Sequence, residues 1–154
     1  MSPFLARTGV QLLLPLASAW VKWQESSILR RGVPLTASLL IDARRMGVRC
    51  PERVRLRVVD QVPGGMPPWL RGMVTPLGLC SPLTSGMSLR YGIFIRSDCW
   101  GDRQLVIHEL AHTAQYERLG GIWPFLKLYL SECLVTPGYP FGPLEQEAKR
   151  AEEC

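Results

Sequence analysis

The stretch Gln104-Leu-Val-Ile-His-Glu-Leu-Ala-His-Thr-Ala-Gln-Tyr116 contains an H-E-x-x-H motif and both histidines of the 154-residue chain. Residues four positions apart lie one above the other on the same face of an α-helix. Two imidazoles so placed, those of His108 and His112, can bind one Zn²⁺ at about 2.0–2.1 Å per nitrogen. Glu109 follows the first histidine, so it lies beside the metal and can accept a proton from a water that the metal activates.

The sequence around the motif predicts one helix from Asp102 to Leu119. Neither Pro nor Gly interrupts this segment, and Asp102 or Asp98 can cap its N-terminus. Gly120-Gly121 then predicts where the helix ends. A helical setting is the context that this motif needs, and it favours a metal site over a pair of core or surface histidines.

The length and composition predict one globular domain, residues 1–154, with one core. Hydrophobic residues make up 47% of the chain and charged residues 20%, which is typical of a folded protein. The formal net charge is +5, but the arginines are scattered and no basic block is interleaved with aromatic residues. A solvated basic surface is therefore favoured, and no specific nucleic-acid partner is expected.

The cysteines argue for a reducing compartment. Their number is odd and no C-x-x-C pair occurs, which speaks against a disulfide framework and against a cysteine zinc site. We expect reduced thiols in a cytoplasmic protein, at Cys50, Cys80, Cys99, Cys133 and Cys154.

The N-terminus permits an alternative to the cytoplasm. Arg7 and then Leu12-Leu-Leu-Pro-Leu-Ala-Ser-Ala19 resemble a signal peptide, so export with residues 1–19 as the signal is the second interpretation. Against it, Gln11 and Pro15 break the apolar run. The run is also shorter than the roughly 20 apolar residues of a membrane span, so no span is expected.

The N-terminal region, residues 1–48, is predicted to hold two helices, at 4–31 and at 35–46. Pro15 is expected to kink the first helix. The packed face of this helix is predicted from three large apolar residues: Trp20, Trp23 and Ile28.

The sheet is predicted within residues 53–96. The segment 53–60 alternates, and its inward positions are predicted to be Val54, Leu56 and Val58. The segment 87–96 alternates again, with one face formed by Leu89, Tyr91, Ile93 and Ile95. Between these strands, 62–68 is expected to be loop, and 73–75 is a candidate short strand. A strand that directly precedes a metal helix can lie along the rim of its cleft and pair with an extended peptide.

Residues 102–154 are predicted to form the helices of the metal site. After the H-E-x-x-H helix, the pattern indicates a helix at 122–134, a rigid Pro/Gly-rich loop at 136–143 and a last helix at 144–153. A zinc site with two histidines needs at least one more ligand, which must come from a carboxylate or a cysteine. Glu145 and Glu147 are the candidates on the last helix, and they project about 200° apart, so only one can face the metal.

The H-E-x-x-H motif followed by a helical glutamate resembles the zincin metallopeptidases of the glutamate-zincin type. Glu145-x-Glu-Ala-x is similar to the E-x-E-A-D helix of several such families, in which the first glutamate is the third zinc ligand; this implies Glu145. The aspartate that those families carry four residues later is Lys149 here, which is a departure. About the last seventy residues also resemble small bacterial zinc peptidases of uncharacterised function.

The resemblance implies an α+β, zincin-like minimal domain, in which a small mixed or antiparallel sheet packs on helices around a central H-E-x-x-H helix. It also implies a zinc-dependent metallopeptidase that hydrolyses a peptide or protein substrate, with Glu109 as the general base. Tyr139 is the first candidate for stabilising the oxyanion and Tyr116 the second. Gln115 or Tyr116 is expected to hydrogen-bond to a metal ligand and orient it.

Two other functions remain open at this point. A non-catalytic zinc-bound interaction module would keep His108, His112 and Glu145 but would not need Glu109. A DNA-associated protease would use the basic surface of the chain, and its DNA binding would depend strongly on salt.

Overall fold

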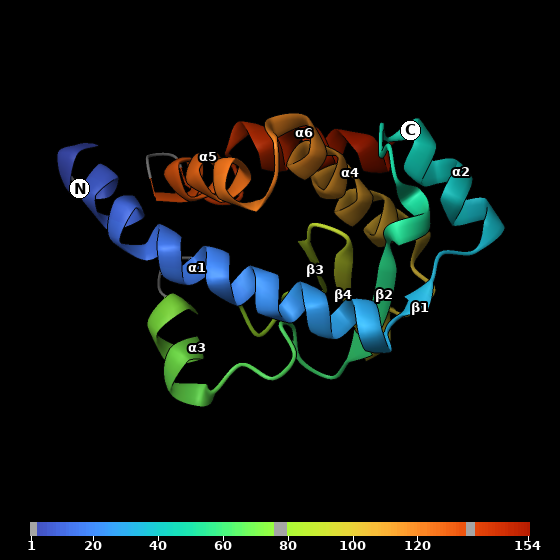
Figure 1. The fold of residues 1–154 in the computed structure, drawn as a ribbon, viewed down its shortest axis with the longest axis horizontal. Helices are drawn as coiled ribbons and strands as arrows, with labels where there is room; N and C mark the ends of the chain where they lie inside the picture. The colour runs from blue at the N-terminus through green and yellow to red at the C-terminus, as the bar shows by residue number, and fades with distance from the viewer. Residues whose placement is uncertain (1–2, 76–79, 135–137) are drawn as a thin grey trace.

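A small sheet lies between helices in the computed structural model, which describes residues 3–75, 80–134 and 138–154 (Figure 1). The order of the described strands is β1-β2-β4-β3. Their bounds are Val33–Pro34 for β1, Arg55–Val59 for β2, Gly86–Leu89 for β3 and Gly92–Arg96 for β4. Strands β2 and β4 are parallel, whereas β1 and β3 are antiparallel to their neighbours. The sheet is therefore mixed, and the predicted α+β class is confirmed.

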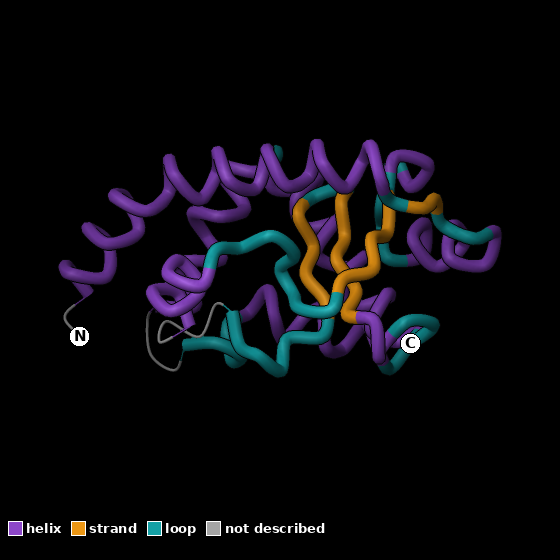
Figure 2. The backbone as a smooth tube through the Cα atoms, turned by 90° about the horizontal axis from the view of Figure 1, so that it is seen from below, coloured by secondary structure: helices purple, strands orange, loops and turns teal. Residues whose placement is uncertain are grey.

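Helix α1, Pro3–Arg31, runs along one face of this sheet (Figure 2). It is one continuous helix despite Pro15, and its N-terminal half extends beyond the sheet (Figure 1). The buried apolar positions on α1 recur at intervals of a helical stripe: Val10, Leu14, Val21 and Ile28. Trp23 lies off that stripe and is 61% exposed, so the prediction that it packs in the core is wrong.

Strand β4 is buried on both faces. Successive side chains of a strand point to opposite sides, and each side of this strand packs in a core cluster. Phe94 belongs to the core cluster that includes Ile28 of α1. Ile93 and Ile95 belong to a second cluster, with Leu110 of helix α4. Helix α4, Arg103–Leu119, thus covers the face of the sheet opposite α1.

Strands β3 and β4 form a hairpin where the alternation had predicted one strand. The chain reverses at Arg90, whose φ is 64°. The guanidinium of Arg90 donates to both carboxylate oxygens of Glu25 at 2.8 and 2.7 Å, and Thr113 Oγ1 donates to the carbonyl of Arg90 at 2.7 Å. The turn is therefore fastened to α1 and α4 at once. Leu89 therefore packs in the cluster on the α1 side, whereas Ile93 packs on the α4 side. The prediction that these two side chains share a face is wrong.

Three further details of the sheet region differ from the sequence-based expectations. Residues 68–74 form helix α3, Pro68–Val74, where loop and a candidate strand had been expected. Strand β1 lies in the region 1–48 that was predicted to be helical. Val58 is 43% exposed, so the prediction that it points inward is wrong.

The remaining helices are α2, Ala37–Arg45, α5, Ile122–Leu134, and α6, Pro143–Glu152. Each corresponds to a predicted helix. Residues 135–137, which include the start of the predicted loop 136–143, lie outside the described residues. All five cysteines are free thiols. Among the described helices, none is both long enough and apolar enough to cross a bilayer.

Candidate metal centre

Helix α4 holds both histidines in the interior of the protein. The carboxylate of Asp102 accepts from the backbone N–H of Leu105 at 3.1 Å and caps the N-terminus, and Gly120 ends the helix with a φ of 100°. Eleven consecutive residues, 106–116, are buried. His108 is 9% exposed and His112 is 6% exposed, so both imidazoles are withdrawn from bulk water.

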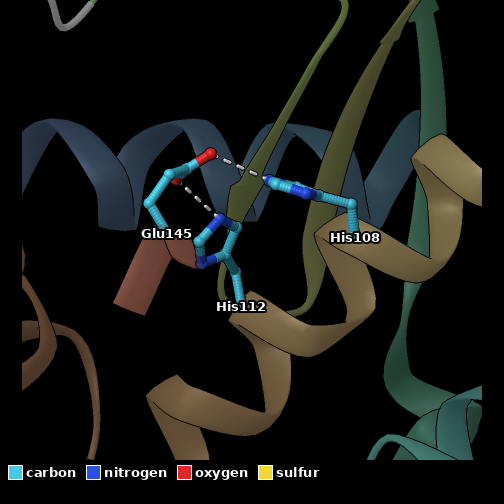
Figure 3. Close-up of side chains that lie close together, drawn as sticks. All are labelled: His108, His112 and Glu145. Atoms are coloured by element: carbon cyan, nitrogen blue, oxygen red, sulfur yellow. Dashed lines mark ion pairs between the residues drawn. The ribbon is translucent and has the colours of Figure 1, made fainter. Parts of the chain in front are cut away.

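Helix α6 brings Glu145 to the two histidines (Figure 3). Glu145 Oε1 lies 3.2 Å from His108 Nε2, and Glu145 Oε2 lies 3.3 Å from His112 Nε2. One ligating atom from each of the three residues falls within 4.8 Å of the others. The three side chains thus converge on one small volume, and all of them are largely buried.

The other ring nitrogen of each histidine has its own partner. His108 Nδ1 is 2.6 Å from Glu152 Oε1, and His112 Nδ1 is 2.8 Å from Gln115 Oε1. An acceptor at Nδ1 holds the proton there and leaves the Nε2 lone pair free for a metal. Two imidazoles so oriented and one carboxylate are a ligand set that Zn²⁺ takes, so the residues fit this ion.

Gln115 also connects the two helices of the cluster. Its side-chain amide N–H donates to the carbonyl of Leu144 at 3.0 Å. The backbone N–H of Leu144 in turn donates to Glu132 Oε2 at 3.0 Å. The start of α6, and with it Glu145, is therefore held against α4 and α5 from two sides.

Glu152 is the member of the cluster that the sequence did not single out. It lies seven residues after Glu145, which is about two helical turns, so the two carboxylates share a face of α6. The resemblance pointed to position 149, one turn earlier, where Lys149 is exposed. A helical projection of α6 beyond that position was the signal that could have found Glu152.

Glu147 lies outside the cluster. Its two carboxylate oxygens accept from the guanidinium of Arg118 at 2.9 and 3.0 Å on the exposed side of α6. Of the two candidate third ligands, the structure brings only Glu145 to the histidines.

The carboxyl group of Glu109 lies between α4 and the edge strand β3. Glu109 is 4% exposed, and a Cβ placed on Gly86 of β3 would lie 2.8 Å from Glu109 Oε1. Burial raises the pKa of Glu109, while the two histidines and a backbone hydrogen bond at Ser88 oppose this. Glu109 is therefore positioned by close packing against a residue that has no side chain.

The electrostatics of the cluster favour ionised carboxylate at Glu145. Burial acts to raise its pKa, but hydrogen bonds from His108 and His112 outweigh burial and hold that pKa well below its usual range. Burial also acts to lower the pKa of His108, yet the carboxylates of Glu145, Glu109 and Glu152 raise it to about 9. In the absence of a metal, His108 thus carries a proton that a cation would replace.

Three tyrosines lie near the cluster. The hydroxyl of Tyr129 on α5 donates to Glu145 Oε2 at 3.3 Å. Tyr139 is 44% exposed and lines a cleft beside these residues. Burial of its hydroxyl and the charge of Glu145 raise the pKa of Tyr139 to about 12. Tyr116 is buried, stacks on Phe125 at a centroid distance of 3.7 Å and donates to the carbonyl of Ser88 at 3.5 Å. The hydroxyl of Tyr129 therefore contacts the cluster and Tyr139 lines the cleft beside it, whereas Tyr116 is a core residue.

A cleft of about 460 Å³ opens beside the three candidate ligands. His108, Glu109, His112 and Glu145 form part of its lining, and β3 contributes 86–89. The rest of the lining is mostly apolar and comes chiefly from α1, α3 and α5. The cluster is therefore buried from bulk water but open to a ligand of moderate size.

Comparisons with protein-family models, with curated proteins and with solved structures found no match to this chain.

Proposed function

We propose that this protein is a zinc-dependent metallopeptidase, a hydrolase of the zincin type that cleaves peptide bonds. The observation that carries the proposal is the convergence of His108, His112 and Glu145, with Glu109 adjoining them in a cleft. A structural zinc site is closed by four protein ligands, whereas a catalytic site has three and leaves a position for water or substrate. The three-residue ligand set favours the catalytic class.

The protein residues have distinct roles in this proposal. When bound, zinc supplies a Lewis acid that lowers the pKa of a water toward about 7 and polarises a carbonyl. Glu109 accepts the proton of the attacking water and delivers it to the leaving amine. Its buried position supports this role, because burial brings the pKa of a carboxylic acid closer to neutrality.

Strand β3 supports a peptide as the substrate. It is an edge strand of the described sheet, and it lies against α4 at Glu109. The unpaired groups of an edge strand can hydrogen-bond to an extended peptide. In β3 the backbone N–H of Ser88 bonds Glu109 and its carbonyl accepts from Tyr116, so a peptide would pair with other groups of this edge. A substrate added to β3 would pass beside Glu109. The rim position was predicted for the strand that directly precedes the metal helix, but that strand is β4, which lies between β2 and β3, and the edge strand is β3.

Tyr139 and Tyr129 are the candidates for donating a hydrogen bond to the oxyanion. Both hydroxyls are held neutral, since burial raises the pKa of each. A neutral hydroxyl is the donor that a developing negative charge requires. Tyr139 is more exposed to the cleft, and Tyr129 is closer to the ligand Glu145.

Metal analysis tests the ligand set. We expect the purified protein to bind a single zinc ion, the Glu145→Ala variant to lose it, and the Glu147→Ala variant to retain it. The second variant is a matched control, because it removes the same side chain from the same helix outside the cluster. Full metal occupancy in the Glu145→Ala variant would contradict the assignment.

Peptide hydrolysis tests the activity. The zinc-loaded protein should cleave a mixture of short peptides and lose this activity on chelation, and zinc should restore it. If the loaded protein binds zinc but cleaves no peptide in a diverse mixture, the proposed activity is wrong.

A further inference from the structure

The cleft has one polar wall and one apolar wall. The polar wall is the cluster on α4 and α6. The apolar wall is built by α1 and α3, with Leu13, Leu16, Trp20, Trp69 and Leu70 in the lining. Among the described residues that line the cleft, the acidic and histidine side chains are His108, Glu109, His112 and Glu145, and no other carries a charge.

Some side chains of the apolar wall have little support in the protein itself. Leu16 is 73% exposed and Trp69 is 68% exposed. Leu16 lies on α1 and Trp69 lies on α3. Large exposed apolar patches next to a site mark surfaces that a ligand covers. This wall lines the same cleft as His108, His112 and Glu145, so a ligand that fills the cleft reaches both.

We infer that the substrate segment carries large, uncharged apolar side chains, which lie against α1 and α3 while the scissile bond lies at the metal centre. The inference rests on the proposed peptidase function and names the substrate class. A charged side chain would lose its hydration in this cleft without finding a partner, whereas an aliphatic or aromatic one would gain by leaving water. The cleft volume of about 460 Å³ is within the usual range for sites that enclose a small ligand.

Two peptides of equal length test this inference in the zinc-loaded protein. One carries Leu and Phe on both sides of the scissile bond, and the other carries Ser and Asn at the same positions. We expect kcat/KM for the apolar peptide to exceed that for the polar peptide by about tenfold or more, because each apolar side chain that leaves water adds to the binding free energy. Equal rates would overturn the inference and leave the peptidase proposal standing.

Matched variants locate the preference on the apolar wall. Leu13 and Leu128 are each 39% exposed, but only Leu13 lines the cleft. Trp69 and Trp23 are both largely exposed, but only Trp69 lines it. We expect Leu13→Gln and Trp69→Gln to lower kcat/KM for the apolar peptide several-fold, and Leu128→Gln and Trp23→Gln to leave it unchanged. If the control variants lower it equally, the preference does not come from this wall and the inference is wrong.

Binding separates failure of the inference from failure of the proposed function. In the zinc-loaded Glu109→Gln variant, the fluorescently labelled apolar peptide should bind about tenfold more tightly than the polar one. If this preference holds but the wild type cleaves neither peptide, the apolar cleft stands and the hydrolase proposal falls. If the variant binds the two peptides equally, the inference is wrong. It is also wrong if the protein binds phosphatidylcholine vesicles tightly and Trp69→Gln abolishes vesicle binding but leaves peptide binding unchanged, since the wall would then contact a lipid surface.

Discussion

The polar wall of the cleft and its apolar wall differ in how their side chains are held. On the polar wall, every ring nitrogen of His108 and His112 has a partner between 2.6 and 3.3 Å away. On the apolar wall, Leu16 and Trp69 are mostly exposed. Chemistry requires atoms fixed to within a fraction of an ångström, whereas apolar recognition tolerates movement. We therefore expect the polar wall to perform the reaction and the apolar wall to select the substrate.

The largest effect is expected from the base on the polar wall. Replacing Glu109 with Gln keeps the shape but removes the proton acceptor, so kcat should fall by about 10²–10⁴-fold. Zinc content and thermal stability should stay as in the wild type, because the ligands are untouched. Retained activity would reject Glu109 as the base. A non-catalytic zinc module would instead show no activity in either protein and an unchanged ability to bind its partner.

A methyl group on the neighbouring strand should have the next largest effect. The Cβ introduced by Gly86→Ala would lie 2.8 Å from Glu109 Oε1, so the carboxylate must move. A displacement of about 1 Å can lower the rate about 100-fold. Gly72→Ala on α3 is the control, because a Cβ there meets no atom within 4 Å. Steady-state kinetics of both variants measure the difference, and equal activity would show that Glu109 has room to adapt.

The support behind the first histidine should affect the metal more than the reaction. Glu152→Gln keeps an acceptor near His108 Nδ1 but removes its charge, and we expect zinc affinity to fall about 10–100-fold. Glu153→Gln changes the next residue of the chain, which is exposed, and should leave affinity unchanged. Competition with a fluorescent zinc chelator measures both. Equal affinities in the two variants would leave Glu152 without a role.

Loss of the buried ion pair behind the hairpin should destabilise the polar wall. Arg90→Ala leaves the carboxylate of Glu25, whose side chain is 4% exposed, without its guanidinium. We expect the free energy of unfolding to drop by about 1–3 kcal/mol, as when a buried polar group loses its partner. Arg44→Ala removes an exposed pair with Glu52 and should cost less than about 1 kcal/mol. Chemical denaturation compares the two, and similar losses would mean that the hairpin turn is not held by this pair.

The smallest effect is expected on the stability of the apolar wall. Leu16→Gln should change the free energy of unfolding by no more than about 0.5 kcal/mol, because the side chain is mostly exposed. Leu14→Gln, two residues earlier on α1, replaces a side chain that is 3% exposed and should cost about 2–5 kcal/mol. A large loss in the Leu16 variant would show that the wall serves stability rather than recognition.

The two walls also differed in how far the sequence could predict them. The H-E-x-x-H helix and its N-cap followed from local rules, because spacing along one helix fixes which side chains share a face. Glu152, Tyr129 and the Glu25–Arg90 pair depend on how distant helices pack, which no local pattern contains. The hairpin was hidden because Met87–Arg96 alternates through the turn at Arg90, so only the positive φ there distinguishes two strands from one. The apolar wall comes from α1 and α3, and its exposed leucines and tryptophans look in the sequence like ordinary core residues.

Glu145 lies on α6, whereas the histidines lie on α4, and the whole of α5 separates them in the chain. A cation bound by all three would thus act as a cross-link that fastens the last described helix to the body of the protein. Its loss would remove that link and leave α6 held by hydrogen bonds and packing alone. The folded state would then be less stable and the chain more open to degradation, since anything that binds only the folded state protects it. Zinc supply in the cell would then govern how much of this protein survives, in addition to how fast each copy works.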